Sequence, residues 1–393
     1  DCLLSRGLGD VYKRQVYTLI KEIEKYHAHV AEDKEKEITR RELLTEHIDC
    51  TMKYFEELAR EKQLDKMLER FVRQMFGELS MEGIQFLREM IRGISLFHDM
   101  GKINPDFQKQ AMHNQQIAKN NMFWHIGKRH SLISAIMYID YYVEEFKQKV
   151  KEKEDKEKLR PLIIYHAYVI ERHHSDLKNF QEFISSLKEG AGKDVIDVFL
   201  EEKCEAYQKK FGLTEKRLLN ILKAIDNTDW NIEKNIVLYT YVKLLYSFLV
   251  ASDYYATAEF MTQKEIQQYG NLDEIQKWVD IYENTSLMKG IRKYQTEQYP
   301  KTAEDLKREK NINALRTEML TDAENILKEN EESSLFYLEA PTGSGKSNTA
   351  MDISFRFIKD HADLKKIYYI YPFNTLVEQN MAVSYTHLTL PTT

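Results

Sequence analysis

Apolar residues recur at every third or fourth position through most of the first three quarters of the chain. Around Met52, Phe55 and Leu58, for example, they form the stripe that one face of an amphipathic helix requires. Only two prolines interrupt residues 16–285, and glycine is sparse there. We therefore predict an all-helical domain over residues 16–285, which makes the chain mainly α.

The pattern changes near residues 286–312, where polar residues dominate and we expect a linker. Two short apolar runs follow, at 335–339 and 366–371, separated by a glycine-containing loop and an amphipathic stretch over 347–359. Strand, loop, helix and strand make a βαβ unit, whose parallel strands belong to a larger sheet than these residues supply. We therefore predict an incomplete α/β domain of the RecA-like P-loop type over residues 313–382.

The composition fits a protein with packed cores, because 42% of its residues are apolar and 31% are charged. A formal net charge of −6 argues against a uniformly basic nucleic-acid coat, although it is compatible with a local basic groove. The three cysteines have no paired spacing, which indicates neither a disulfide framework nor a zinc finger. No apolar run approaches the ~18–20 residues of a membrane span. We expect a cytoplasmic protein with no membrane partner.

The two ends of the chain look foreign to it. Residues 10–15, Asp-Val-Tyr-Lys-Arg-Gln, can be encoded by GAT GTG TAT AAG AGA CAG. The reverse complement of that string, in a shifted frame, encodes Val-Ser-Tyr-Thr-His, which is the sequence of residues 383–387. One DNA segment in both orientations resembles a transposon-end adapter for sequencing libraries. We therefore expect residues 1–15 and 383–393 to be artefacts, and the natural protein to continue past both ends.

Polar residues that suit transition metals interrupt two apolar helical runs. His98 and Asp99 follow the apolar residues 91–97, and Asp253 follows 244–251. Burying such groups is costly unless they are paired or coordinate a metal, and a two-metal centre needs several imidazole and carboxylate ligands. The chain offers seven candidates, namely His47, His98, Asp99, His130, His173, His174 and Asp253. We interpret the remaining histidines of the helical part as surface or core-edge residues, namely His27, His29, His113, His125 and His166.

Four segments carry a specific family resemblance. They are FHDMGKINPDFQ at residues 97–108, HSLISA at 130–135, RHHSD at 172–176 and SDYYAT at 252–257. The first resembles the HD phosphohydrolase superfamily, and all four together resemble the HD nuclease domain of the CRISPR-associated nuclease-helicase of type I interference systems. They occur in the order of that family, and Leu44-Thr-Glu-His47 fits its first metal histidine.

The resemblance implies two divalent transition-metal ions (Mn, Fe, Co or Ni), with Asp99 bridging them. One ion would be held by His47, His98, Asp99 and Asp253, and the other by Asp99, His130, His173 and His174. It also implies attack of a metal-activated hydroxide on a phosphodiester of single-stranded DNA, and recruitment by an RNA-guided surveillance complex. Lys102, three and four residues after Asp99 and His98, would place positive charge on the scissile phosphate. The alternative is a surface lysine after a glycine turn.

A second motif, in the predicted α/β domain, is a phosphate-binding loop. It reads Ala340-x-x-Gly343-x-Gly345-Lys346-Ser347, with alanine at the first glycine position. Its backbone N–H groups and lysine bind phosphates and its serine binds Mg²⁺, so the expected ATP and Mg²⁺ ligands are Thr342, Gly343, Ser344, Gly345, Lys346 and Ser347. The Ala-Pro-Thr-Gly opening resembles superfamily 2 helicases, residues 371–376 resemble their next motif, and Arg316 matches an upstream position.

The leading hypothesis is a metal-dependent nuclease of CRISPR antiviral interference that cuts single-stranded DNA and is fused to an ATP-dependent DNA helicase. No Asp-Glu-x-His motif follows the P-loop, so we expect no ATP hydrolysis by this chain. Two alternatives stay open. One is an HD-type phosphohydrolase acting on nucleotides, and the other is a nucleotide-switched DNA-binding scaffold whose histidines are structural.

Overall fold

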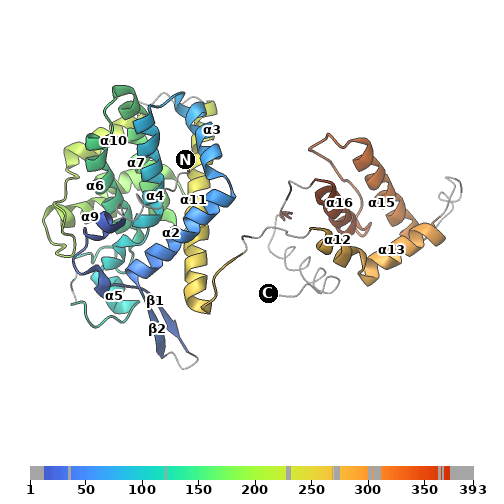
Figure 1. Cartoon of the computed structure of the whole chain (residues 1–393), viewed down its shortest axis with the longest axis horizontal. Coiled ribbons are helices and arrows are strands. Elements are labelled where there is room, and N and C mark those ends of the chain that lie inside the picture. Colours follow the sequence, from blue (N-terminus) through green and yellow to red (C-terminus); the bar gives the residue numbers. More distant parts are fainter. Residues whose placement is uncertain are drawn as a thin grey trace. The chain divides into compact units, whose positions relative to one another are not determined.

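The computed structural model divides the chain into two compact units, residues 1–267 and 268–393 (Figure 1). It describes residues 13–33, 37–118, 120, 122–226, 232–267, 269, 275–299, 304, 311–361, 364 and 367–371. The predicted artefact segments therefore lie outside the described residues, except for residues 13–15, which belong to a helical turn over 13–17.

The first unit contains a β hairpin near its start, which corrects the prediction of an all-helical domain. After the 3-10 turn η1 (Ile23–Lys25), strand β1 (His27–Glu32) pairs antiparallel with β2 (Ile38–Leu43). The hairpin depends on side chains distant in sequence. Gln108 exchanges hydrogen bonds with the backbone of His27, and Arg40 donates to the carbonyl of Phe260 at 3.0 Å. Because these partners lie in later helices, the sequence of residues 27–43 by itself does not predict the two strands.

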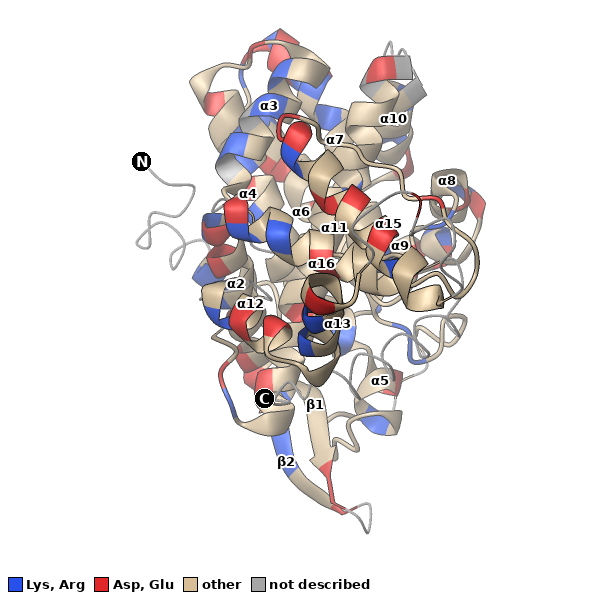
Figure 2. Cartoon of the chain, turned by 90° about the vertical axis from the view of Figure 1, so that its right-hand side faces the viewer, with Lys and Arg blue, Asp and Glu red and all other residues tan. Residues whose placement is uncertain are grey.

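Helices form the rest of the first unit, as predicted. The bounds are α2 (Leu44–Glu61), α3 (Leu64–Phe76), α4 (Met81–Phe97), η2 (Met100–Ile103), α5 (Pro105–Gln110), α6 (Ser131–Lys149), α7 (Lys153–Arg172), α8 (Phe180–Glu189), α9 (Ala191–Leu200), α10 (Glu215–Asp226) and α11 (Ile232–Thr262). The core lies where α4, α6, α7 and α11 pack together around buried aromatic rings such as Phe86, Tyr138 and Tyr142. Acidic and basic residues both occur along α2 (Figure 2), whereas the described charged residues of α3, Lys66, Arg70 and Arg73, are basic.

Helix α11 supplies one wall of this core. Residues 235–262 are long and apolar enough to cross a membrane, judged by length and composition alone. Tyr241, Leu245 and Leu249 of this helix are nevertheless completely buried against other helices, and Phe248 packs edge-on to Phe55 of α2 with ring centroids 5.9 Å apart. We conclude that α11 is a core helix of the first unit and not a membrane span.

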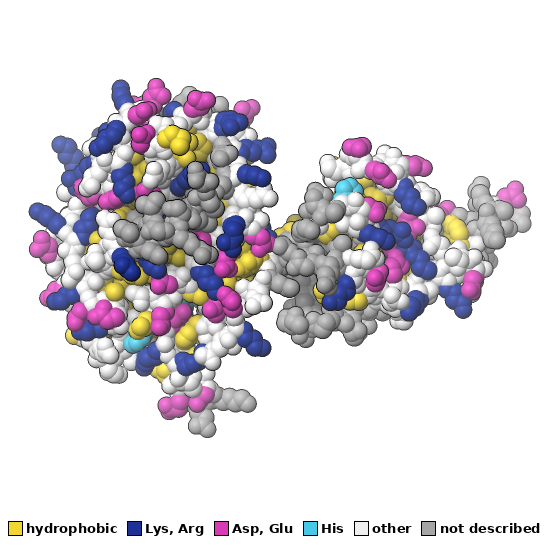
Figure 3. Space-filling model, in the orientation of Figure 1, with side chains coloured by type: hydrophobic (Ala, Val, Ile, Leu, Met, Phe, Trp, Pro, Cys, Tyr) yellow, Lys and Arg dark blue, Asp and Glu magenta, His cyan; other side chains and the backbone are white. Residues whose placement is uncertain are grey.

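The second unit contains α12 (Ile275–Glu283), α13 (Ser286–Glu297), α15 (Ile312–Glu329) and α16 (Lys346–Asp360). Its small core joins Tyr282 and Met288 to Ile291, Met351 and Phe355. The helix α13 lies within the segment where we expect a linker, and the domain boundaries stay a prediction. Charged side chains cover much of the surface of each unit (Figure 3).

The two predicted strands of the second unit are wrong for the residues that the structure describes there. Residues 335–340 and 367–371 have no strand assignment, and the side chains of Leu335, Tyr337 and Ile370 are 86%, 88% and 92% exposed. A strand is maintained by hydrogen bonds to a neighbouring strand, and these segments pair with none among the described residues. The predicted helix between them is confirmed as α16.

Candidate metal centre

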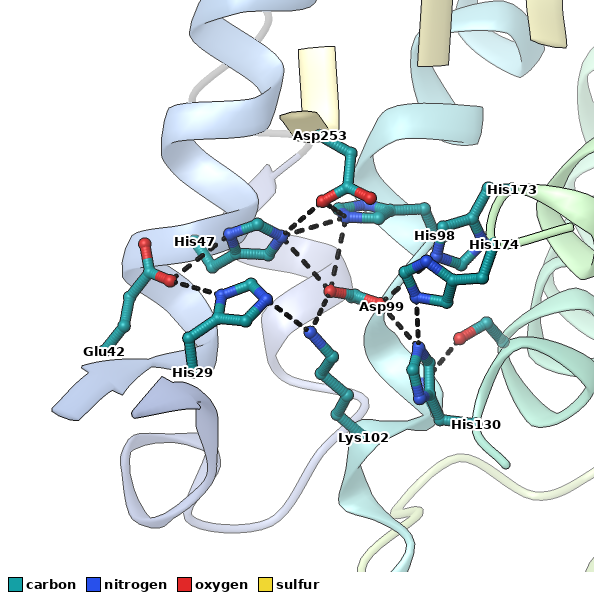
Figure 4. A network of polar contacts seen from close by, with 12 residues as sticks. His29, Glu42, His47, His98, Asp99, Lys102, His130, His173, His174 and Asp253 are labelled. Atoms are coloured by element: carbon teal, nitrogen blue, oxygen red, sulfur yellow. Dashed lines mark hydrogen bonds and ion pairs between the residues drawn. The ribbon is translucent and has the colours of Figure 1, made fainter. Parts of the chain in front are cut away.

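The centre is built around Asp99, at the end of α4. The apolar face of α4 is buried up to Phe97, so the next residues, His98 and Asp99, are carried into the interior and are completely buried. Its two oxygens face basic groups, with Lys102 Nζ 2.6 Å from Oδ2 and His130 Nε2 3.0 Å from Oδ1. Because a buried carboxylate costs several kcal/mol unless it is paired, this position favours cations, and the Lys102 ammonium is one of them. Figure 4 shows Asp99 in the middle of a ring of imidazoles and carboxylates.

One set of candidate ligands faces Oδ2 of Asp99. His47 of α2 places Nε2 3.2 Å from this oxygen, and His98 Nε2 lies 3.4 Å from it. Asp253 of α11 completes the set, with Oδ1 3.1 Å from His47 Nε2 and 3.9 Å from His98 Nε2. Three helices distant in sequence thus bring together the four residues His47, His98, Asp99 and Asp253.

A second set faces the other oxygen, Oδ1. His130, which precedes the first turn of α6, places Nε2 3.0 Å from it, and His173, just after α7, places Nε2 3.5 Å from it. His174 Nε2 lies 3.0 Å from His130 Nε2. This set, Asp99, His130, His173 and His174, shares only Asp99 with the first. His174 is exposed, whereas His47 and His98 are fully buried, so the second set is the one that faces solvent.

The histidine tautomers favour metal binding. His98 Nδ1 and His173 Nδ1 each lie 2.6 Å from a backbone carbonyl, of Ser95 and Ile170 respectively, and donate to it. Their protons are therefore on Nδ1, and the Nε2 lone pairs point into the centre, as in metal-ligating histidines. The Nε2 atoms of His98 and His47 face each other at 3.3 Å. Two facing lone pairs repel unless a proton or a metal ion lies between them.

The charges of the site also suit cations. Burial alone would raise the pKa of Asp99, but Lys102 and His98 hold that pKa well below its usual range. Burial lowers the pKa of His130 to about 4 and that of His174 to about 3, so both are neutral ligands near pH 7. His47 differs. Burial opposes its charge, but Asp253 and Asp99 outweigh burial and raise the pKa of His47 to about 10. Without ions, a proton on His47 therefore partly neutralises the carboxylates.

Lys102 lies inside the centre and is not the surface lysine of the alternative interpretation. The turn η2 buries it, and its Nζ is 2.6 Å from Asp99 Oδ2 and 5.5 Å from the ring centroid of Phe107. Gly101 makes this turn possible. A Cβ there would lie 2.1 Å from the carbonyl oxygen of His130, and its N–H donates to Ser134 Oγ at 2.8 Å. The glycine of the motif thus allows η2 to touch the start of α6.

Two polar residues of the same motif, Asn104 and Gln108, form hydrogen bonds to the neighbouring loop and strand. Asn104 Nδ2 donates to the carbonyls of Gly127 and Arg129, directly before His130. Gln108 Nε2 donates to the carbonyls of Lys102 and His27. These hydrogen bonds join the segment 97–108 to the loop before α6 and to β1. The segment therefore fixes the position of the loop that ends at His130 and of the strand that begins at His27.

Three buried or half-buried residues lie where their sequence context does not predict them, namely His29, Glu42 and His166. His29 and Glu42 of the hairpin, with His47, form a third close group of potential ligands. His29 was interpreted as a surface or core-edge residue and Glu42 was not considered, because only the hairpin brings them to the centre. His166 was also interpreted as surface or core-edge, but it is fully buried among core helices. No spacing along the sequence marks these positions.

The P-loop residues lie in the second unit, before and at the start of α16. Gly343 and Gly345 have positive φ angles of 80° and 92°, which only glycine adopts without strain. Lys346 Nζ donates to the carbonyls of Ala340 and Pro341. Arg316 of α15 donates from its guanidinium to the carbonyl of Gly343 at 2.8 and 3.1 Å. The two glycines therefore form the turn before α16, and Arg316 contacts this turn.

Two sets of histidines and carboxylates that share one buried aspartate, within a mainly helical domain, define an HD-type metal-dependent hydrolase domain. Comparison with known families agrees. The chain belongs to the family described as Cas3, HD domain, which matches residues 31–242, more than half of its length. Residues 288–390 match the family described as Type III restriction enzyme, res subunit, so a partial helicase region follows. No curated protein matches the chain. The predicted family resemblance is confirmed.

Proposed function

We propose that the HD domain is a two-metal nuclease that cuts single-stranded DNA in CRISPR antiviral interference. The observation that carries this proposal is the division of Asp99 between two ligand sets, one at each oxygen. A single-metal site would need only one of these sets. The membership in the Cas3 family supports DNA as the substrate and an RNA-guided surveillance complex as the partner.

The seven candidate ligands would have distinct duties. Asp99 would bridge the two ions, with His47, His98 and Asp253 on one side and His130, His173 and His174 on the other. When bound, two divalent ions neutralise phosphate charge and lower the pKa of the attacking water. Lys102, held beside Asp99, would place its ammonium group against the scissile phosphate as catalytic cation. DNA would approach from the side of His174, because that ligand is exposed.

The test uses circular single-stranded DNA, the chain and Mn²⁺, Co²⁺ or Ni²⁺ in separate reactions. We expect cleavage with at least one metal, loss of cleavage in Asp99→Asn, and wild-type cleavage in the control His113→Ala, which replaces an exposed histidine. Intact DNA with a folded, metal-loaded wild type would refute the nuclease. If that protein instead hydrolysed deoxynucleotides, the site would belong to a nucleotide-directed HD hydrolase.

We further propose that residues 342–347 bind ATP and Mg²⁺ in the full-length protein, which would be a cytoplasmic helicase as well as a nuclease. Thr342, Gly343, Ser344 and Gly345 would surround the phosphates, and Ser347 would bind Mg²⁺. Lys346 would exchange its two carbonyl acceptors for phosphate oxygens. A fluorescent ATP analogue should bind the wild type and not Lys346→Ala, and neither should hydrolyse ATP. ATP turnover by this chain would contradict the proposal.

A further inference from the structure

The hairpin reaches the metal centre through one carboxylate. Glu42 of β2 is almost fully buried, and its Oε2 lies 2.7 Å from His29 Nδ1 and 3.4 Å from His47 Nδ1 (Figure 4). The rings of His29 and His47 meet edge to face, with centroids 4.5 Å apart. On its other side, His29 Nε2 lies 3.4 Å from Lys102 Nζ. Glu42 and His29 therefore touch two members of the centre without facing Asp99.

Counting protons assigns the direction of each contact. The ammonium of Lys102 can only donate, so His29 Nε2 must accept, and the proton of a neutral His29 lies on Nδ1, facing Glu42. His47 directs Nε2 to the metal centre, so its Nδ1 must carry a proton, which also faces Glu42. Both N–H groups thus face one carboxylate oxygen, that of His29 at 2.7 Å and that of His47 at 3.4 Å. Neither Nδ1 atom that faces Glu42 has a lone pair left for an ion, and the His29 Nε2 lone pair is directed at Lys102.

We propose that Glu42 and His29 are positioning residues of the metal centre. Glu42 orients His47, by accepting from Nδ1, so that Nε2 points at the ion, and His29 holds Glu42 in that place. The 3.4 Å between Glu42 Oε2 and His47 Nδ1 is within ion-pair distance, so the carboxylate attracts the Nδ1–H group of His47 across this gap. Carboxylates behind metal-binding histidines fix the tautomer and ring orientation in this way, and losing one typically lowers metal affinity by about 10–100-fold.

The hairpin is fixed firmly enough for this role. Arg40 bonds the end of α11 through the carbonyl of Phe260, Arg41 donates to the carbonyl of Met112, and Gln108 holds the backbone of His27. The competing interpretation is that His29, Glu42 and His47 bind a third ion. The Lys102 ammonium beside His29 opposes it, because it would repel that ion and already uses the His29 lone pair.

Metal titration by calorimetry, with metal content measured in parallel, tests the inference on the whole chain with Mn²⁺. We expect two ions in the wild type. Glu42→Ala should keep two sites but weaken one by about 10–100-fold, and Glu42→Gln should weaken it less, because the amide oxygen still accepts. His29→Ala should weaken the same site, and the double variant should bind no worse than Glu42→Ala, since both act through one carboxylate.

The control is His27→Ala, which removes the neighbouring hairpin histidine, whose Nδ1 has no hydrogen-bond partner; it should bind both ions as the wild type does. Unchanged affinity in Glu42→Ala would overturn the inference, and so would a third ion that this variant loses. The inference rests on the proposed two-metal site but not on cleavage. Two ions bound without DNA cutting would refute the nuclease and leave the positioning role intact, whereas a wild type that binds no ion would refute both.

Discussion

Replacing Gly101 with alanine should break the contact that aligns the two halves of the metal centre. Gly101 lies in η2, between Asp99 and Lys102, and a Cβ there would be 2.1 Å from the carbonyl oxygen of His130 and 2.7 Å from the amide nitrogen of Ser134. Both clashing atoms are backbone, so no side-chain rotation relieves them. The turn η2 and the start of α6 must move apart.

The size of the effect follows from the geometry. Contacts to a Cβ are essentially never below 3.0 Å, so the two segments must separate by about 0.9 Å. Overpacking of this kind costs about 1–3 kcal/mol of stability. His130 Nε2 is only 3.0 Å from Asp99 Oδ1, and a displacement of ~1 Å at a catalytic group can cost about 100-fold in rate. Because a 100-fold loss of rate corresponds to about 2.7 kcal/mol, we expect function and stability to lose comparable free energies.

Hydrogen exchange on peptides from α4 and α6 measures the stability, because one global unfolding curve would mix the two units of the chain. Calorimetry with Mn²⁺ and cleavage of circular single-stranded DNA measure the function. Gly93→Ala is the matched control within α4, since its Cβ would clash equally closely but with a side chain, the hydroxyl of Tyr142 at 2.1 Å and two of its ring carbons at 2.7 Å. Gly290→Ala in α13 meets nothing within 4 Å and should gain up to about 1 kcal/mol of helix stability.

We expect Gly101→Ala to lose metal affinity and cleavage, Gly93→Ala to lose stability alone, and Gly290→Ala to lose neither. If Gly101→Ala bound metal and cut DNA like the wild type, the contact between η2 and α6 would not align the centre. If Gly93→Ala lost metal affinity to the same degree, any packing defect in α4 would suffice, and the specific role of Gly101 would be refuted.

Three further predictions concern the ions and the core. Metal content should fall from two ions to none in Asp99→Ala and to one in Asp253→Ala, and equal losses in both would contradict the bridging role. Chelation should lower the melting temperature of the first unit, because an ion at 100 times its Kd stabilises the fold by about 2.7 kcal/mol; an unchanged value would argue against bound metal. His166 accepts from Tyr241 and donates to Tyr138, which itself donates to the carbonyl of Met90, and burial lowers its pKa to about 3. The unfolded state therefore binds one more proton below pH 6.5, so stability should fall as pH drops from 6.5 towards 3, by about 1.4 kcal/mol per unit. His166→Gln should lack that slope in acid unfolding, and an equal slope in both proteins would contradict it.

The sequence by itself predicted the metal-binding side chains of the centre, but not the residues that surround them. His98 and Asp99 ended an apolar run, and so did Asp253, and burial of such groups demands a partner. The two glycines at 343 and 345 likewise predicted a tight loop before α16 from the sequence alone. In the structure both have positive φ angles, which glycine adopts without strain. Each of these signals depends only on a residue's immediate neighbours in the chain, within a single helix or turn.

Only the tertiary structure decided which groups meet across the chain. It divides the two oxygens of Asp99 between two ligand sets and brings Asp253 next to His47 across more than two hundred residues. It also folds residues 27–43 into a hairpin that places Glu42 and His29 behind the centre. The reason is physical: strand pairing and side-chain contacts between distant segments depend on packing of the whole domain, which no local spacing encodes.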